Sequence, residues 1–116
     1  MNNIKIKLKT SELTGAALDW AVAKCELGEA INEVDDPHFY STDWALAGPI
    51  IERERIATWF EHYEDEDAGL PCWFAAKYCE REYPGPTPLI AAMRCYVASR
   101  VGDEIELPEE LKEVMA

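Results

Sequence analysis

The sequence predicts an α+β fold, in which a small, mainly antiparallel sheet packs on two helices at about residues 15–26 and 88–101. Residues 88–101 are almost all apolar, and a soluble helix that is apolar all round is buried. Apolar and polar residues alternate near the N-terminus and again after residue 55, which is typical of strands. At 116 residues, of which 48% are hydrophobic, we expect a single domain over residues 1–116 with one core.

The first strand and the first helix follow each other near the N-terminus. Ile4, Ile6 and Leu8 alternate with lysines, which predicts a half-buried strand whose lysines protect a solvated edge. A turn leads to Thr14, which we expect to cap a helix over about residues 15–26 that Gly28 ends. The residues of this helix that we expect to face the core are Leu18, Ala21, Val22 and Cys25. Trp20 lies beside this stripe, either at the edge of the core or in the wall of a pocket.

The connection from residue 29 to residue 49 is long and rich in aromatic residues. It carries Phe39, Tyr40 and Trp44 and ends at Gly48-Pro49, which we interpret as a break. A connection of this length and composition is either packed on the core as a lid or shaped for a ligand.

The second half of the chain predicts a hairpin and a last strand around the central helix. Residues 55–63 and 72–78 read as the two arms of a β-hairpin, with a short helix as the alternative for either arm, and residues 64–71 read as a solvated acidic loop. A short strand follows the helix at residues 104–107, and a helical turn at residues 109–115.

The central helix has clear signals at both ends. Thr87 is a good N-cap, Pro88 suits the first helical position, and Gly102 ends the helix. The small residues of this helix allow another element to approach closely, and we expect that element to be the Ala17/Ala21 stripe of the first helix. These small residues are Ala91, Cys95, Ala98 and Ser99.

The four cysteines, Cys25, Cys72, Cys79 and Cys95, show no close pairing motif. We expect free thiols, with no metal and no other cofactor. The alternative is a zinc site from Cys72 and Cys79 with His38 or His62, but this spacing matches no usual pattern.

The charge excludes some classes of partner. With 23 acidic against 11 basic residues, the net charge is −12, and direct nucleic-acid binding needs clustered cations. No apolar run is long enough to span a bilayer, so we expect no membrane partner. We expect no enzyme either, because nucleophile elbows, phosphate loops and metal-protease helices are missing from the sequence.

Arg94 and Arg100 are the charged residues of the otherwise apolar central helix. Each has two interpretations. It pairs with a carboxylate of this acidic chain, or it clamps an anionic ligand beside tryptophan and tyrosine rings.

Three stretches together resemble the NinX-like family of tailed-phage and prophage accessory proteins. They are Ser11–Lys24, Tyr40–Trp44 followed by Gly48–Glu54, and Gly85–Ser99. The resemblance implies phage origin and a setting in the host cytoplasm, and it brings no established chemistry. Accessory proteins of this size often act by binding, either by blocking a host factor or by taking up a small signalling molecule. Counter-defence against the host is one role of this kind.

Three functions remain open. The first is an aromatic and arginine pocket for a small nucleotide-like anion, which we favour because the aromatics cluster while the acids are dispersed. The second is an acidic inhibitor or decoy that occupies a host protein, including one that binds nucleic acid. The third is a structural role, as a homo-oligomer. The candidate ligand-binding residues are Trp20, Tyr40, Thr42, Asp43, Trp44, Arg53, Arg94 and Arg100.

Overall fold

A computed structural model describes residues 5–28, 39–61, 72–77 and 80–108 of the chain. The described part is an α+β fold with two small antiparallel sheets, as predicted for the fold class. The predicted acidic loop at 64–71 and the helical turn at 109–115 lie outside the described residues.

The first sheet is a ribbon of two strands that come from the two ends of the described chain. Strand β1, Lys5–Lys9, pairs antiparallel with β5, Glu104–Pro108, and Leu8 lies opposite Ile105. Both strands were predicted. A short 3-10 helix, η1 at Thr10–Glu12, follows β1 at the place of the predicted turn. Helix α1, Gly15–Leu27, comes next and has almost the same bounds as the predicted helix.

The second sheet has the order β2-β3-β4. Strands β2, Ile56–Glu61, and β3, Cys72–Lys77, form the predicted hairpin, with Trp59 opposite Phe74. Strand β4, Tyr83–Gly85, was not predicted, because its three residues include Pro84 and lack any alternation. A proline is tolerated there because β4 is at the edge of the sheet.

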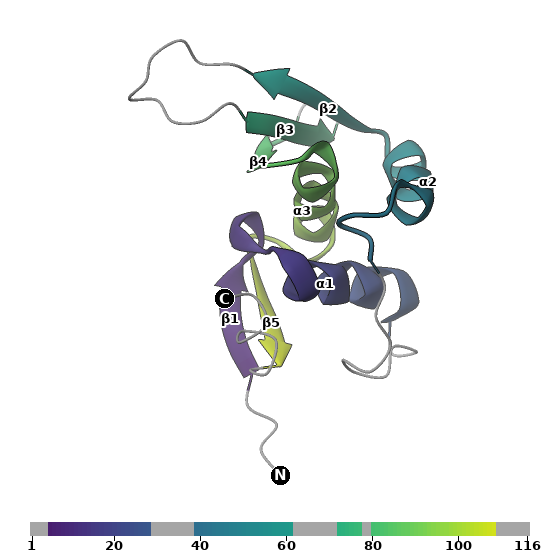
Figure 1. The fold of residues 1–116 in the computed structure, drawn as a ribbon. Coiled ribbons are helices and arrows are strands. Elements are labelled where there is room, and N and C mark those ends of the chain that lie inside the picture. Colours follow the sequence, from purple (N-terminus) through teal and green to yellow (C-terminus); the bar gives the residue numbers. More distant parts are fainter. Residues whose placement is uncertain (1–4, 29–38, 62–71, 78–79, 109–116) are drawn as a thin grey trace.

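Helix α3, Pro88–Val101, is the centre of the molecule, and Figure 1 shows it between the three-stranded sheet and α1. Thr87 caps it as predicted, since its hydroxyl accepts from the backbone N–H of Ile90 over 3.1 Å. Every residue from Ala91 to Ala98 is buried, which confirms the prediction of a buried central helix.

Two of the small residues of α3, Ala91 and Cys95, lie against the three-stranded sheet. A Cβ atom placed on Gly85 would lie 2.6 Å from the backbone N of Ala91, so β4 approaches α3 closely at this position. The Cys95 thiol is near the backbone of Lys77 on β3. Ala91 and Cys95 therefore face the three-stranded sheet, and α1 also packs against α3, as predicted.

Helix α2, Trp44–Glu54, is the main difference from the sequence-based expectation of an irregular connection with a Gly-Pro break. Asp43 caps it by accepting from the backbone N–H of Ala45 over 2.9 Å. Pro49 lies inside the helix, and buried Ala47 and Ile50 anchor the helix to the core. Packing of this apolar face outweighs the hydrogen bond that proline cannot make.

Candidate functional site

Charged side chains from three helices and one strand converge beside α3, and we call this group the arginine cluster. Its members are Glu26 of α1, Arg53 and Glu54 of α2, Lys77 of β3, and Tyr96 and Arg100 of α3. The cluster depends on α2, because that helix contributes two of its residues and joins α1 to α3.

Glu54 is the carboxylate that links the cluster. Its Oε2 accepts from Nε of Arg53 over 2.8 Å and from a terminal nitrogen of Arg100 over 3.1 Å. Its Oε1 accepts from Nζ of Lys77, also over 3.1 Å. One carboxylate thus holds three cations from three different elements.

Glu26 forms the second half of the cluster. It accepts hydrogen bonds from both terminal nitrogens of Arg53, over 3.1 and 2.6 Å, in the bidentate geometry typical of arginine–carboxylate pairs. The hydroxyl of Tyr96 also donates to Glu26. The guanidinium carbons of Arg53 and Arg100 lie 5.7 and 5.3 Å from the centre of the Tyr96 ring, which is within cation–π range.

The pKa values reflect this network. Hydrogen bonds from Arg53, then from Lys77 and Arg100, lower the pKa of Glu54 to about 2, against an opposing effect of burial. The hydrogen bond from Arg53 also lowers the pKa of Glu26. Burial, followed by the hydrogen bond to Glu26, raises the pKa of Tyr96, so its hydroxyl stays protonated and donates at neutral pH.

The cluster is cationic in a strongly acidic molecule. Its three cations outnumber its two carboxylates, so it carries one positive charge in a chain of net charge −12. The side chains of Arg53 and Arg100 are each 48% exposed, whereas that of Glu54 is 11% exposed. The cations are therefore the part of the cluster that solvent and solutes reach.

The structure brings together two of the predicted site residues, Arg53 and Arg100. For Arg100, the internal pairing with a carboxylate is the interpretation that the structure shows. Tyr40 lies close to the same place: burial, and then the charge of Glu26, raise its pKa. Tyr40 is 8% exposed and closes the core.

Arg94 lies apart from the cluster and contacts other elements. Its Nε donates to the backbone O of Leu13 over 2.8 Å, and a terminal nitrogen donates to the backbone O of Pro84 over 2.7 Å. The side chain is buried, and burial lowers the pKa of its guanidinium. Arg94 thus bonds backbone carbonyls, which neither of its two sequence-based interpretations foresaw.

The remaining predicted site residues are at and before the start of α2, or on α1. Trp44 is 56% exposed in the first turn of α2, and nine helical residues place it about 13 Å along the axis from Arg53. Thr42 is exposed just before the helix, and Asp43 caps it. Trp20 is half-buried, with Nζ of Lys24 5.7 Å from its ring centre.

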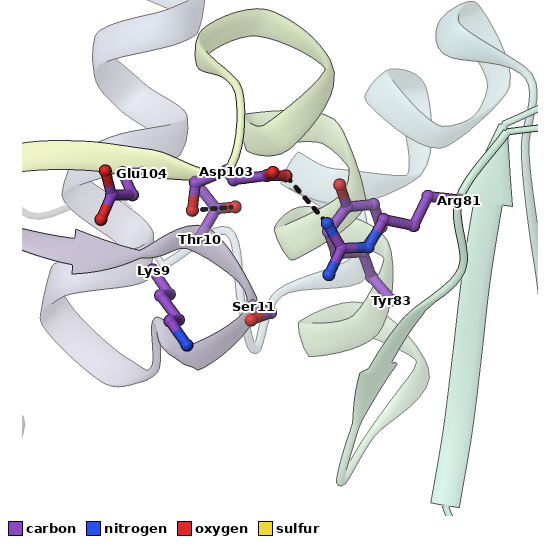
Figure 2. A pocket seen from close by; sticks show the side chains of 7 residues that line it. All are labelled: Lys9, Thr10, Ser11, Arg81, Tyr83, Asp103 and Glu104. Atoms are coloured by element: carbon purple, nitrogen blue, oxygen red, sulfur yellow. Dashed lines mark hydrogen bonds and ion pairs between the residues drawn. The ribbon is translucent and has the colours of Figure 1, made fainter.

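Sequence reasoning did not select Glu26, Glu54 or Tyr96. The one available signal was the run Glu52–Arg55, whose alternating charges we interpreted as a solvated surface. It also missed a polar groove at the other side of the molecule, between η1 and the residues that precede β4 (Figure 2).

Cys25, Cys72 and Cys95 are free thiols, and Cys79, His38 and His62 of the alternative zinc site lie outside the described residues. Within the described ranges, no three His, Cys, Asp or Glu side chains gather to hold a metal ion. Each helix in the described part of the chain is too short or too polar to cross a bilayer.

Comparison with protein families assigns the chain to a class of bacteriophage proteins. The family model described as Bacteriophage P22, NinX matches residues 9–100, which is most of the chain. The chain belongs to this NinX family, which confirms the resemblance seen in the three sequence stretches and makes it a phage accessory protein. None of the curated proteins compared with the chain matches it.

Proposed function

We propose that this phage protein acts by binding rather than by catalysis, and that the arginine cluster binds the phosphate of a small nucleotide-like anion. One observation carries the proposal: two half-exposed guanidinium groups, from α2 and α3, converge on a single oxygen of Glu54. A guanidinium has five N–H donors, and Arg100 uses one of them for Glu54. The Arg100 side chain is also 48% exposed, so a solute can reach its guanidinium.

The local charge supports the same ligand class. Phosphate is repelled by a molecule of net charge −12, so an anion binds best where the cations outnumber the acids. Exposed acids elsewhere on the surface are screened over roughly 10 Å at 0.1 M salt, whereas direct contacts with Arg53 and Arg100 are not. A protein with such a site would take up a signalling nucleotide made by the host, which is a route to counter-defence.

The test is a thermal-shift screen against mono-, di- and cyclic nucleotides. A nucleotide present at a hundredfold its dissociation constant should stabilise the folded protein by about 2.7 kcal/mol. Arg100→Gln should abolish the shift, because it removes an exposed donor group and leaves the ion pairs of Arg53 with Glu26 and Glu54 in place. Arg81→Gln is the matched control, since Arg81 is an exposed, ion-paired arginine outside the cluster.

Two results would contradict the anion site. The first is that no nucleotide raises the unfolding midpoint of the well-folded protein. The second is that Arg100→Gln and Arg81→Gln reduce the shift equally, since the effect would then come from overall charge.

A second candidate function is binding to a host protein through the start of α2. Three large apolar side chains are exposed within eight residues: Phe39 by 57%, Trp44 by 56% and Leu46 by 37%. Aromatic side chains that are exposed together are typical of protein interfaces, and the acidic body suits a host protein that normally binds nucleic acid.

Quantitative capture from host lysate at 0.05 and 0.5 M salt tests this second function. A host protein held by the acidic surface should be lost at high salt, displaced by added DNA, and lost with Trp44→Ala. Phe60→Ala is the control, because Phe60 is also about half exposed but lies on β2. A captured protein that resists salt and DNA, or binds Trp44→Ala equally well, would rule out the decoy.

A further inference from the structure

A groove of about 410 Å³ lies between the β1–β5 ribbon and the residues that lead into β4 (Figure 2). Its volume is within the range of small-molecule sites. Thr10 and Tyr83 are the buried members of its lining, and the remaining lining residues are polar or charged. These are Lys9, Ser11, Arg81, Asp103 and Glu104.

Three of the lining side chains have no polar partner among the residues that the structure describes. Within the described part of the chain, Lys9, Ser11 and Glu104 have side chains that take part in no hydrogen bond or ion pair. Thr10 differs, because its hydroxyl is within hydrogen-bond distance of the backbone oxygens of Gly102 and Asp103. The lining therefore combines a hydrogen-bonded Thr10 with ammonium, hydroxyl and carboxylate groups that have no polar partner among the described residues.

The other two charged groups of the lining, Arg81 and Asp103, form a weak pair. Arg81 donates to Asp103 over 3.0 Å, but their side chains are 65% and 73% exposed. Exposed ion pairs contribute little to stability and exchange readily for other partners. The Arg81 guanidinium also lies 5.5 Å from the ring centre of Tyr83, which is within cation–π range.

The charges decide which ligand class fits. Lys9 and Arg81 balance Asp103 and Glu104, so the lining is formally neutral. A bare anion would meet two carboxylates here in a molecule of net charge −12, and a bare cation would meet two cations. A ligand that carries both signs satisfies both pairs.

We propose that this groove binds a small zwitterion with an ammonium and a carboxylate group, of the amino-acid or dipeptide class. The ligand carboxylate accepts from Arg81, Lys9 and the Ser11 hydroxyl, and its ammonium donates to Asp103 and Glu104. This site is separate from the arginine cluster and does not depend on it.

The experiment uses L-alanyl-L-alanine as the probe in a titration followed by amide ¹H–¹⁵N NMR of the full chain. We expect saturable shifts for the amides of Ser11, Arg81, Asp103 and Glu104. N-acetyl-alanyl-alanine lacks the ammonium, and alanyl-alanine amide lacks the carboxylate. Each blocked form should bind at least about tenfold more weakly, because each loses one of the two charged contacts.

Matched variants separate the groove from general charge effects. Lys9→Gln and Glu104→Gln should each weaken binding of the free dipeptide several-fold. Lys7→Gln and Glu106→Gln change neighbouring exposed residues of the same strands outside the groove and should not alter it. Arg100→Gln should also leave dipeptide binding unchanged, which keeps this result distinct from that of the nucleotide screen.

Three outcomes would overturn the zwitterion site. The free dipeptide produces no saturable shift, a blocked form binds as tightly as the free one, or the control variants weaken binding as much as the groove variants do.

Discussion

Arg94 on α3 donates a hydrogen bond to the backbone carbonyl of Leu13, 81 positions earlier in the chain, over 2.8 Å. The same guanidinium reaches the carbonyl of Pro84 on β4 over 2.7 Å. One buried side chain therefore connects the central helix, the turn before α1 and the edge of the three-stranded sheet. Its role in this structure is to hold these three segments together.

Arg94→Lys should destabilise the protein by about 1–3 kcal/mol, because a single ammonium cannot reach both carbonyls in the way that the planar guanidinium does. Urea unfolding measures the loss. Arg81→Lys is the control and should change the midpoint little, since Arg81 is exposed and weakly paired. An unchanged midpoint for Arg94→Lys would show that the two carbonyl bonds do not hold the fold.

Glu54 should make stability depend on pH in the acid range. Its pKa in the folded state is about 2, below the ordinary value of 4.5, so the folded protein binds fewer protons than the unfolded chain between these values. The contribution is complete above about pH 4.5 and is lost as the pH falls toward 2. Urea midpoints between pH 2 and 6 should therefore fall more steeply for the native sequence than for Glu54→Gln.

The same urea series measures the stability of Glu54→Gln at pH 7 and the pH slope of a control variant. At pH 7, Glu54→Gln should be less stable by about 1–3 kcal/mol, since three cations lose their shared carboxylate. Glu52→Gln, an exposed neighbour, should keep the native pH slope. Parallel pH profiles for Glu54→Gln and the native protein would contradict the assigned role of Glu54.

Gly85→Ala should destabilise by about 1–3 kcal/mol, because its Cβ would lie 2.6 Å from the backbone N of Ala91 and force β4 away from α3. Gly48→Ala is the contrast. Gly48 lies inside α2 with open space around its Cβ position, so alanine there should stabilise by about 0.5–1 kcal/mol. Thermal unfolding of both variants should show a lower midpoint for Gly85→Ala and a higher midpoint for Gly48→Ala. A stable Gly85→Ala variant would show that the close approach of β4 is not required.

Cys95 should be alkylated much more slowly than Cys72 in the folded protein. Burial raises the pKa of the Cys95 thiol to about 11, and the side chain is 2% exposed, whereas Cys72 is only partly buried. A short pulse of iodoacetamide at pH 8, followed by peptide mass spectrometry, compares the two thiols. Equal rates in urea would serve as the reference, and equal rates in the native state would contradict the buried position of Cys95.

The sequence by itself determined the elements that have a clear local period or clear end signals. Lysines alternating with apolar residues define β1, and Thr87, Pro88 and Gly102 bound α3. The same holds for α1. The β2–β3 hairpin was the favoured interpretation of its segment, but the sequence left a short helix open for either arm. These signals are local because they depend on backbone geometry and on which face of one element is apolar.

Helix α2 was not predicted from the sequence, because the local sequence signals in this segment argue against a helix. Gly48-Pro49 reads as a break, and Arg55 ends the helix in the left-handed region, at φ 56°, where glycine is the usual signal. Burial of Ala47 and Ile50 against the rest of the protein stabilises the helix despite these residues.

Only the tertiary structure decided how the charged side chains are used. Arg53 and Arg100 were recognised as candidates, but the carboxylates that join Arg53 to α1 and Arg100 to α2 lie 27 positions away in Glu26 and 46 positions away in Glu54. Lys9 and Arg81 line one groove although they come from β1 and from the approach to β4. Charge pairs act over a few ångströms in space and have no period along the chain, so the packing of helices and strands chooses the partners.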